Sequence, residues 1–211
     1  MEPLLPEETP PEAKSVFGDQ LSVAQKYADL LARDGDLLGL IGPRELPKLW
    51  SRHILNSAVV AELVRPGETV ADVGSGAGLP GIPMAIMQLE ANFTLIEPME
   101  RRAKWLSEVV VPSLGLKNVK VLNVRAEEAP VDQFDVVTAR AVSALPKLLK
   151  MVVDLAVSGG RILALKGAKA QDEIADSKSL VKKLGLKDFE IITVGEKYLK
   201  EPTTVVRIGL L

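Results

Sequence analysis

Residues 69–83 read TVADVGSGAGLPGIP, and this stretch decides the fold. A short apolar run ends at Asp72, glycines follow at positions 74, 76, 78 and 81, and Pro83 with the apolar residues after it opens a helix. A strand, a glycine-rich turn and a helix in this order present free backbone N–H groups to a nucleotide-like ligand. Glycine tolerates positive φ and has no Cβ, so a ligand can lie against the backbone. The stretch predicts a binding turn for a dinucleotide or for S-adenosylmethionine.

After this turn the chain alternates strand-like and helix-like segments, which predicts a mainly parallel sheet with helices on both faces. Strands are expected over residues 69–73, 93–96, 119–123, 134–139 and 161–165, and helices over 82–89, 101–111, 145–156 and 171–184. The last two strand-like runs, 189–194 and 204–210, have no helix between them and are expected to form an antiparallel hairpin. The predicted fold class is α/β: a class I S-adenosylmethionine-dependent methyltransferase (Rossmann-like) sheet of about seven strands.

Before the turn, the chain divides into a tail and a helical region. Residues 1–12 contain four Pro and four Glu and no basic residue, so we expect a flexible tail. Residues 13–66 are expected to form an N-terminal helical extension, because apolar residues from Phe17 to Leu31 recur at helical spacing and residues 45–64 continue the pattern. Residues 67–211 form the predicted Rossmann-like core, in one compact domain with the extension.

Composition limits the function classes. Of the 211 residues, 47% are apolar and 26% charged, as in an ordinary globular protein. The absence of cysteine excludes disulfides and thiolate metal sites, and a single histidine argues against a histidine-rich site, so no metal is expected. No apolar run is long enough for a membrane span, and the N-terminus lacks the pattern of a signal peptide, so we expect a cytoplasmic protein without a membrane partner.

Charge leaves nucleic-acid binding open. The net charge is −2, yet residues 101–125 hold six Lys or Arg and one acid, Glu108. Such a stretch is either a solvated helix face or a local basic patch for RNA.

The residues around the turn distinguish two cofactor classes. Gly76-x-Gly78-x-x-Gly81 matches the dinucleotide fingerprint of an NAD-dependent oxidoreductase. Acidic residues after successive strands favour S-adenosylmethionine: Asp72 precedes the turn, Glu97 ends the second strand, and Ala126-Glu127 follow the third. Each acid alone has an equally good structural interpretation, as a cap or a solvated strand end. Little chain remains for the substrate domain that a dehydrogenase needs, so a methyltransferase is favoured.

The segments RHILNS (52–57), DVGSGAGLPGIP (72–83), RAEE (125–128), ARAVSAL (139–145) and ALKG (164–167) resemble the RsmG (GidB) family of 16S ribosomal RNA guanine-N7 methyltransferases. The resemblance covers roughly residues 15–210. It implies S-adenosylmethionine as cofactor, contacted by Gly74, Leu79, Glu97, Ala126, Glu127 and Arg140, with Asp72, Gly76 and Gly78 shaping the pocket. The family often has Pro at position 77 and Asp at position 56, where this chain has Ala77 and Asn56. The loss of charge at Asn56 puts an ion pair with Arg52 in doubt.

The resemblance also implies the substrate, a guanine (position 527 in the family's target) of 16S ribosomal RNA in the small subunit or its assembly intermediate. Arg52, His53, Arg140, Ser143 and Lys166 are the implied RNA-contacting residues. Guanine N7 carries a lone pair in the neutral base, so positioning suffices and no catalytic acid or base is expected. In A-form RNA this atom faces a groove that side chains cannot read, so an unpaired or extruded base is expected. A monomer is expected, and an RNA-binding assembly factor without turnover remains the non-enzymatic alternative.

Overall fold

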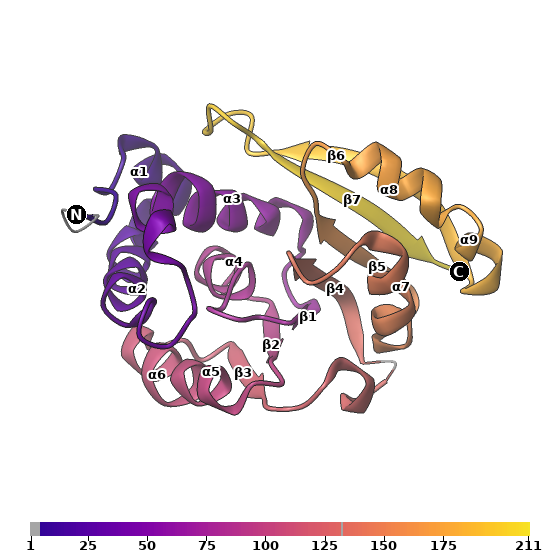
Figure 1. The fold of residues 1–211 in the computed structure, drawn as a ribbon, viewed down its shortest axis with the longest axis horizontal. Coiled ribbons are helices and arrows are strands. Elements are labelled where there is room, and N and C mark those ends of the chain that lie inside the picture. Colours follow the sequence, from indigo (N-terminus) through magenta and orange to yellow (C-terminus); the bar gives the residue numbers. More distant parts are fainter. Residues whose placement is uncertain (1–4, 132) are drawn as a thin grey trace.

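Seven strands form one mixed sheet at the centre of the molecule (Figure 1). The structure is a computed structural model that describes residues 5–131 and 133–211. The strands are β1 (Thr69–Val73), β2 (Asn92–Ile96), β3 (Val119–Leu122), β4 (Phe134–Arg140), β5 (Ala156–Leu165), β6 (Leu186–Val194) and β7 (Thr203–Leu210). Their order across the sheet is β3-β2-β1-β4-β5-β7-β6. The first five run parallel, and β7 pairs antiparallel with both β5 and β6.

The expected mainly parallel sheet with a C-terminal antiparallel hairpin is therefore confirmed. The strand order reverses between β1 and β4, and in open α/β sheets ligands bind outside the carboxyl ends of the strands at such a point. Two strands begin earlier than predicted, β5 at Ala156 and not at Arg161, and β6 at Leu186 and not at Phe189; the other strand ends lie within one residue of the prediction. The pair Gly159-Gly160 looks like a turn in the sequence, but Gly159 adopts a φ of +77° and the strand continues through an irregular register against β4.

Helices cover both faces of the sheet (Figure 1). On one face lie α4 (Gly81–Met87) and the helical run α5 (Glu100–Lys104), η5 (Trp105–Val110) and α6 (Val111–Leu114); on the other lie α7 (Leu145–Val152) and α8 (Ala170–Ser177), followed by α9 (Leu180–Lys183). The expected helix over 171–184 is thus two helices. The α7 sequence shows why its helix packs as it does, because Leu145, Leu148, Leu149 and Val152 fall on one face and are all buried.

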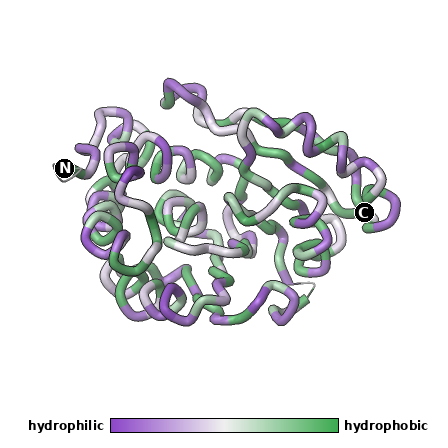
Figure 2. The backbone as a smooth tube through the Cα atoms, in the orientation of Figure 1, coloured by the Kyte–Doolittle hydropathy of each residue, from purple (hydrophilic) through white to green (hydrophobic). Residues whose placement is uncertain are grey.

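The N-terminal extension packs on the α4 face and adds to the same core. It consists of α1 (Pro11–Phe17), α2 (Leu21–Asp34), the 3-10 turn η2 (Pro43–Lys48), the π-helical turn η3 (Leu49–Ile54), α3 (Leu55–Ala58) and the 3-10 turn η4 (Val59–Leu63). Trp50 is a core residue, 2% exposed and edge-to-face with Phe17. Figure 2 shows hydrophobic colour along the central strands and polar colour on the outer turns of the helices.

The N-terminal segment is more structured than its composition predicts. Residues 1–4 of the expected tail lie outside the described residues, but Glu7 is bonded to the extension and α1 already begins at Pro11. One carboxylate oxygen of Glu7 accepts hydrogen bonds from the backbone N–H groups of Trp50 and Ser51, at 2.8 and 2.9 Å, and from the Ser51 hydroxyl. A single acid therefore caps the π-helical turn η3, an interaction that composition alone does not reveal.

Candidate cofactor and substrate site

The glycine turn after β1 is held by hydrogen bonds within the core. The N–H groups of Gly74 and Ser75 donate to the Ile96 carbonyl, and those of Gly78 and Leu79 donate to the Ser75 carbonyl. Gly74, with a φ of +67°, also has the Val142 side chain 2.8 Å from where a Cβ would lie. The loop after β4 therefore rests directly on the loop after β1, at the point where the strand order reverses.

Asp72 is the last residue but one of β1, beneath this turn, and is fully buried. Its Oδ2 accepts the Gly81 N–H at 3.0 Å, and the absence of a side chain at Gly81 permits this approach, because a Cβ would lie 2.7 Å from the same oxygen. Its Oδ1 is buried and has no partner among the described residues. Burial raises the pKa of Asp72 to about 7, although the Gly81 N–H opposes the shift. An unpaired carboxylate oxygen beside the turn fits a ligand that carries positive charge.

Glu97 directly follows β2 and is only 3% exposed. Its two carboxylate oxygens accept the backbone N–H groups of Gly76 and Met99, each at 2.8 Å. Glu97 therefore ties the glycine turn to the start of α5. Ionised carboxylates offer about four acceptor sites, so two remain after these bonds. The predicted ribose contact stays a prediction, and the structural role that the sequence left open is present as well.

The segment after β3 carries the predicted cofactor residues Ala126 and Glu127. Ala126 is buried, whereas Glu127 is exposed, and the two begin a short 3-10 turn. Glu128 accepts the backbone N–H of Arg125 at 3.4 Å, so it is the capping member of the acidic pair. Leu79, in the glycine turn, is half-buried. Glu127 and Leu79 are therefore predicted cofactor residues whose side chains are not fully covered by protein, as is Arg140.

Arg140, at the end of β4, binds the extension through both terminal nitrogens of its guanidinium group. The guanidinium donates to the carbonyl oxygens of Arg52 and His53 at 3.1 Å, to the Ser57 hydroxyl at 2.9 Å and to His53 Nδ1 at 2.7 Å. A planar fork of donors satisfied in this way fixes the side chain in one orientation. Arg140 therefore joins the strand end at the cofactor turn to the RHILNS segment of the extension.

His53 is placed between two charged groups. Because Arg140 donates to Nδ1, the imidazole carries its proton on Nε2 and donates to Glu45 at 2.8 Å. Burial, and then the charge of Arg140, lower the pKa of His53, while Glu45 acts in the opposite direction. Arg52 forms an ion pair with the same glutamate at 3.2 Å, so Glu45 supplies the partner that the sequence left in doubt at Asn56.

Four of the five predicted RNA-contacting residues line one cavity of about 680 Å³: Arg52, Arg140, Ser143 and Lys166. The fifth, His53, is not among its lining residues. Lys166 is already engaged, because its ammonium donates to the Ser143 carbonyl and pairs with Glu173, both at 2.8 Å. Arg52 is the predicted cation that remains mainly exposed at this cavity, with 58% of its side chain accessible.

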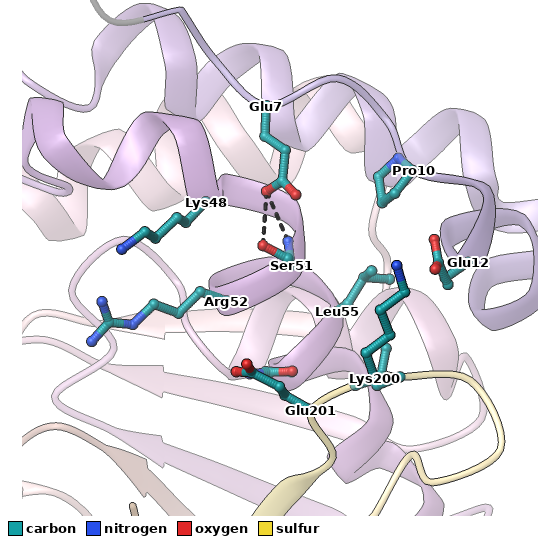
Figure 3. Close-up of a pocket in the computed structure, with 11 residues that line it drawn as sticks. Glu7, Pro10, Glu12, Lys48, Ser51, Arg52, Leu55, Lys200 and Glu201 are labelled. Atoms are coloured by element: carbon teal, nitrogen blue, oxygen red, sulfur yellow. Dashed lines mark hydrogen bonds between the residues drawn. The ribbon is translucent and has the colours of Figure 1, made fainter.

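A second cavity, of about 750 Å³, continues from the first, since Arg52, Asn56 and Glu201 line both. Figure 3 shows it between the extension and the β6–β7 loop, with Lys48 and Arg52 on one side and Lys200 on the other. The Thr203 hydroxyl donates to the Asn56 carbonyl at 2.9 Å and holds this loop against the extension. Together the two cavities form a groove along the carboxyl edge of the core, which we call the extension groove.

The basic stretch over 101–125 is only partly available to a substrate. Arg102 donates to the Gly39 carbonyl at 2.7 Å, and Lys104 pairs with Glu100 at 2.7 Å, one turn earlier. Arg101 is exposed. Arg102 thus serves the packing of α5 against the extension, whereas Lys104 and the other cations of the stretch are exposed.

Several residues of the site were not predicted from the sequence. Glu45, Ser57 and Glu173 each bind a predicted residue, and Tyr27 donates its hydroxyl to the Ala77 carbonyl at 2.7 Å in the glycine turn. The sequence does indicate a buried hydrogen bond for Tyr27, because a tyrosine on the apolar face of a helix needs a partner for its hydroxyl. No such signal marks the glutamates, whose partners lie in other elements.

Solved structures share this fold. A methyltransferase of Methanococcus maripaludis, described as a putative S-adenosyl-L-methionine-dependent enzyme, matches with a TM-score of 0.61 and 12% identity over 80% of this chain and 92% of that one. A SAM-dependent methyltransferase of Aquifex aeolicus matches with a TM-score of 0.56 and 20% identity over 78% and 96%. The sheet order, the glycine turn and the acids at the strand ends define a methyltransferase of the S-adenosylmethionine-dependent class.

Sequence comparisons identify the family within this class. The family model described as rRNA small subunit methyltransferase G matches residues 20–202. Proteins named "Ribosomal RNA small subunit methyltransferase G" are 53% identical in Renibacterium salmoninarum, over 93% of this chain and 92% of that protein, and 47% identical in Clavibacter michiganensis, over 98% and 97%. The chain belongs to the rRNA small subunit methyltransferase G family. This membership overturns the NAD-dependent alternative.

Among the described residues no group of His, Asp and Glu side chains could hold a metal ion. Within the same residues, no helix is long and apolar enough to cross a membrane.

Proposed function

We propose that this chain transfers the methyl group of S-adenosylmethionine to N7 of a guanine in 16S ribosomal RNA of the small ribosomal subunit. The observation that carries this proposal is the meeting of Arg52, Arg140, Ser143 and Lys166 around one cavity, whose wall includes the loop after β4 that rests on the glycine turn. These residues come from the extension, from β4 and the loop after it, and from the end of β5, so only the fold brings them together. A ribosomal RNA substrate implies a cytoplasmic enzyme.

The site's residues fit this cofactor. When bound, S-adenosylmethionine supplies a methyl group activated by a sulfonium charge. The orphaned Oδ1 of buried Asp72 and the carboxylate of Glu97 are acceptors for its cationic and hydroxyl groups. The backbone of Gly74, the side chain of Leu79 and the segment Ala126-Glu127 complete the set that would hold it.

The chain's part in the reaction is positioning. Guanine N7 attacks through its own lone pair, so no residue has to remove a proton first, and methyl transfer moves the positive charge from sulfur to the purine. Arg140 is fixed by four acceptors and holds the wall of the cavity rigid, which keeps the two reactants aligned. Alignment of this kind can supply about 7–11 kcal/mol of the barrier.

The extension groove is the proposed path of the RNA strand beside the target base. Lys48, Arg52 and Lys200 line its second cavity and are suited to phosphate binding. The Glu7 carboxylate in the same cavity is already satisfied by three donors from Trp50 and Ser51, which moderates its repulsion of phosphate. The flanking strand would then cross at Arg52, where the two cavities join.

The test is transfer of labelled methyl to small-subunit RNA that lacks the modification, both naked and in particles, followed by mapping of the labelled base. The expected result is label at N7 of one guanine. Arg140→Lys keeps the charge but loses the fork of donors and should cut transfer strongly, whereas the matched Arg207→Lys, at an exposed pair with Glu190, should not. Cofactor and RNA binding without label on any substrate would instead favour the assembly factor without turnover.

A further inference from the structure

Tyr27 connects the N-terminal extension to the cofactor turn. It lies on α2, is fully buried, and its hydroxyl donates to the Ala77 carbonyl at 2.7 Å. Ala77 is the residue between Gly76 and Gly78, which have φ values of +57° and +90°. Burial raises the pKa of Tyr27 well above its usual value, so the hydroxyl keeps its proton and remains a donor over the whole working pH range. The hydroxyl is thus a lasting donor to the residue that lies between two glycines of positive φ.

The Ala77–Gly78 peptide needs an external partner to hold its orientation. Rotating this peptide plane changes ψ of Ala77 and φ of Gly78, and glycine accepts either sign of φ at little steric cost. Local sterics therefore leave two orientations available. In the structure the plane is held from both ends, because the Gly78 N–H donates to the Ser75 carbonyl at 2.7 Å while Tyr27 binds the Ala77 carbonyl. Loss of the hydroxyl would leave that buried carbonyl without a donor and free the plane to turn.

We propose that Tyr27 is a positioning residue for cofactor binding, which holds the Ala77–Gly78 peptide in the orientation that the cofactor requires. The N-terminal extension is then part of the cofactor site, through Tyr27 as well as through the segment that binds Arg140. A tyrosine that only filled the core would be replaced by phenylalanine without effect on the turn, since the two rings occupy the same space.

The test compares Tyr27→Phe with Ser177→Ala. Ser177 is also fully buried and donates its hydroxyl to a backbone carbonyl, that of Glu173, at 2.7 Å, but it lies on α8 on the other face of the sheet. Calorimetric titration with S-adenosylmethionine, without RNA, should show a Kd raised about three- to tenfold in Tyr27→Phe and unchanged in Ser177→Ala. Hydrogen exchange of the amides in residues 74–81 should accelerate in the first variant alone.

An unchanged Kd and unchanged exchange in Tyr27→Phe would overturn the proposal, even if the variant melted at a lower temperature. If Tyr27→Phe fails to fold in buffer, an osmolyte can restore its folding without restoring the hydroxyl, and the titration is repeated in that osmolyte. A Kd for S-adenosylmethionine equal to that of the unaltered chain in the same osmolyte would then refute the proposal. This inference goes beyond the proposed function. Cofactor binding is measured without RNA, so a failure of RNA methylation leaves the test intact.

Discussion

Replacing Asp72 by Asn is expected to stabilise the cofactor-free fold while weakening cofactor binding. Asp72 is fully buried, its Oδ2 binds the Gly81 N–H, and its Oδ1 has no partner among the described residues. Asn keeps the shape and can still accept the Gly81 N–H through its amide oxygen. It removes the buried charge and places an NH2 group where Oδ1 was, so the contribution of the charge is read from the change of stability with pH.

The magnitude follows from the pKa of Asp72, which is about 7 in the fold against an ordinary value of 3.8. Between these two values the native protein holds a proton that the unfolded chain has released, so this carboxyl makes stability fall as the pH rises. One pKa unit corresponds to about 1.4 kcal/mol. The stability advantage of Asp72→Asn should therefore grow by about 2–3 kcal/mol between pH 5 and pH 8.

The assay is urea unfolding of both proteins at pH 5, 6, 7 and 8, without cofactor. Groups whose pKa is lowered, such as Glu68 and Asp135, change stability in the opposite direction at lower pH, but they are common to both proteins and cancel in the difference. Titration with S-adenosylmethionine at pH 8 should show a Kd at least tenfold higher in the variant, because the cationic ligand then has no unpaired carboxylate oxygen to bind. A stability difference that does not change with pH would refute the reasoning.

Three further predictions concern other parts of the site. Glu97→Gln should raise the Kd for S-adenosylmethionine about tenfold, measured by calorimetry, since an amide can satisfy only one of the two backbone donors that the carboxylate binds. His53, the only histidine in the chain, should titrate below its ordinary pKa of 6.5 in a proton NMR titration, because burial and the charge of Arg140 disfavour its charged form; a pKa above 6.5 would contradict the hydrogen-bond network. The double variant Lys48→Ala, Lys200→Ala should raise the KM for RNA and make it less dependent on salt, with the logarithmic slope smaller by roughly 0.7–0.9 for each phosphate that is no longer neutralised. The exposed control Lys187→Ala should change neither the KM nor the slope. Equal slopes in all variants would show that the RNA does not follow the extension groove.

The sheet was predictable because its signals are local. Each parallel strand except β3 is a short apolar run followed by an α-helix, and the final hairpin follows from the short connection between its strands. The boundary of β5 was not predictable in the same way, since Gly159 marks a turn in most contexts and only pairing with β4 extends the strand through it.

The candidate site was predictable as a set of residues but not as a set of interactions. The sequence places Glu97 and Arg140 at strand ends, and the family resemblance assigns them to a cofactor. Neither source shows that Glu97 binds the backbone of the glycine turn or that Arg140 binds the extension 83 to 88 residues away. The partners of Glu97 and Arg140 lie in other elements and are brought near them by tertiary packing. The periodicity of residues within one element does not predict them.

The four acceptors that Arg140 binds in the extension differ in how far they depend on the amino acid at their position. Two of its four acceptors are the main-chain oxygens of residues 52 and 53, which every amino acid provides, and only the His53 ring and the Ser57 hydroxyl depend on side-chain identity. The side chain at position 52 is therefore not needed to join β4 to the extension, although it lies where the two cavities meet. Substitution at position 52 is therefore expected to leave the junction between β4 and the extension intact, so that the proposed RNA contact of Arg52 can be tested separately.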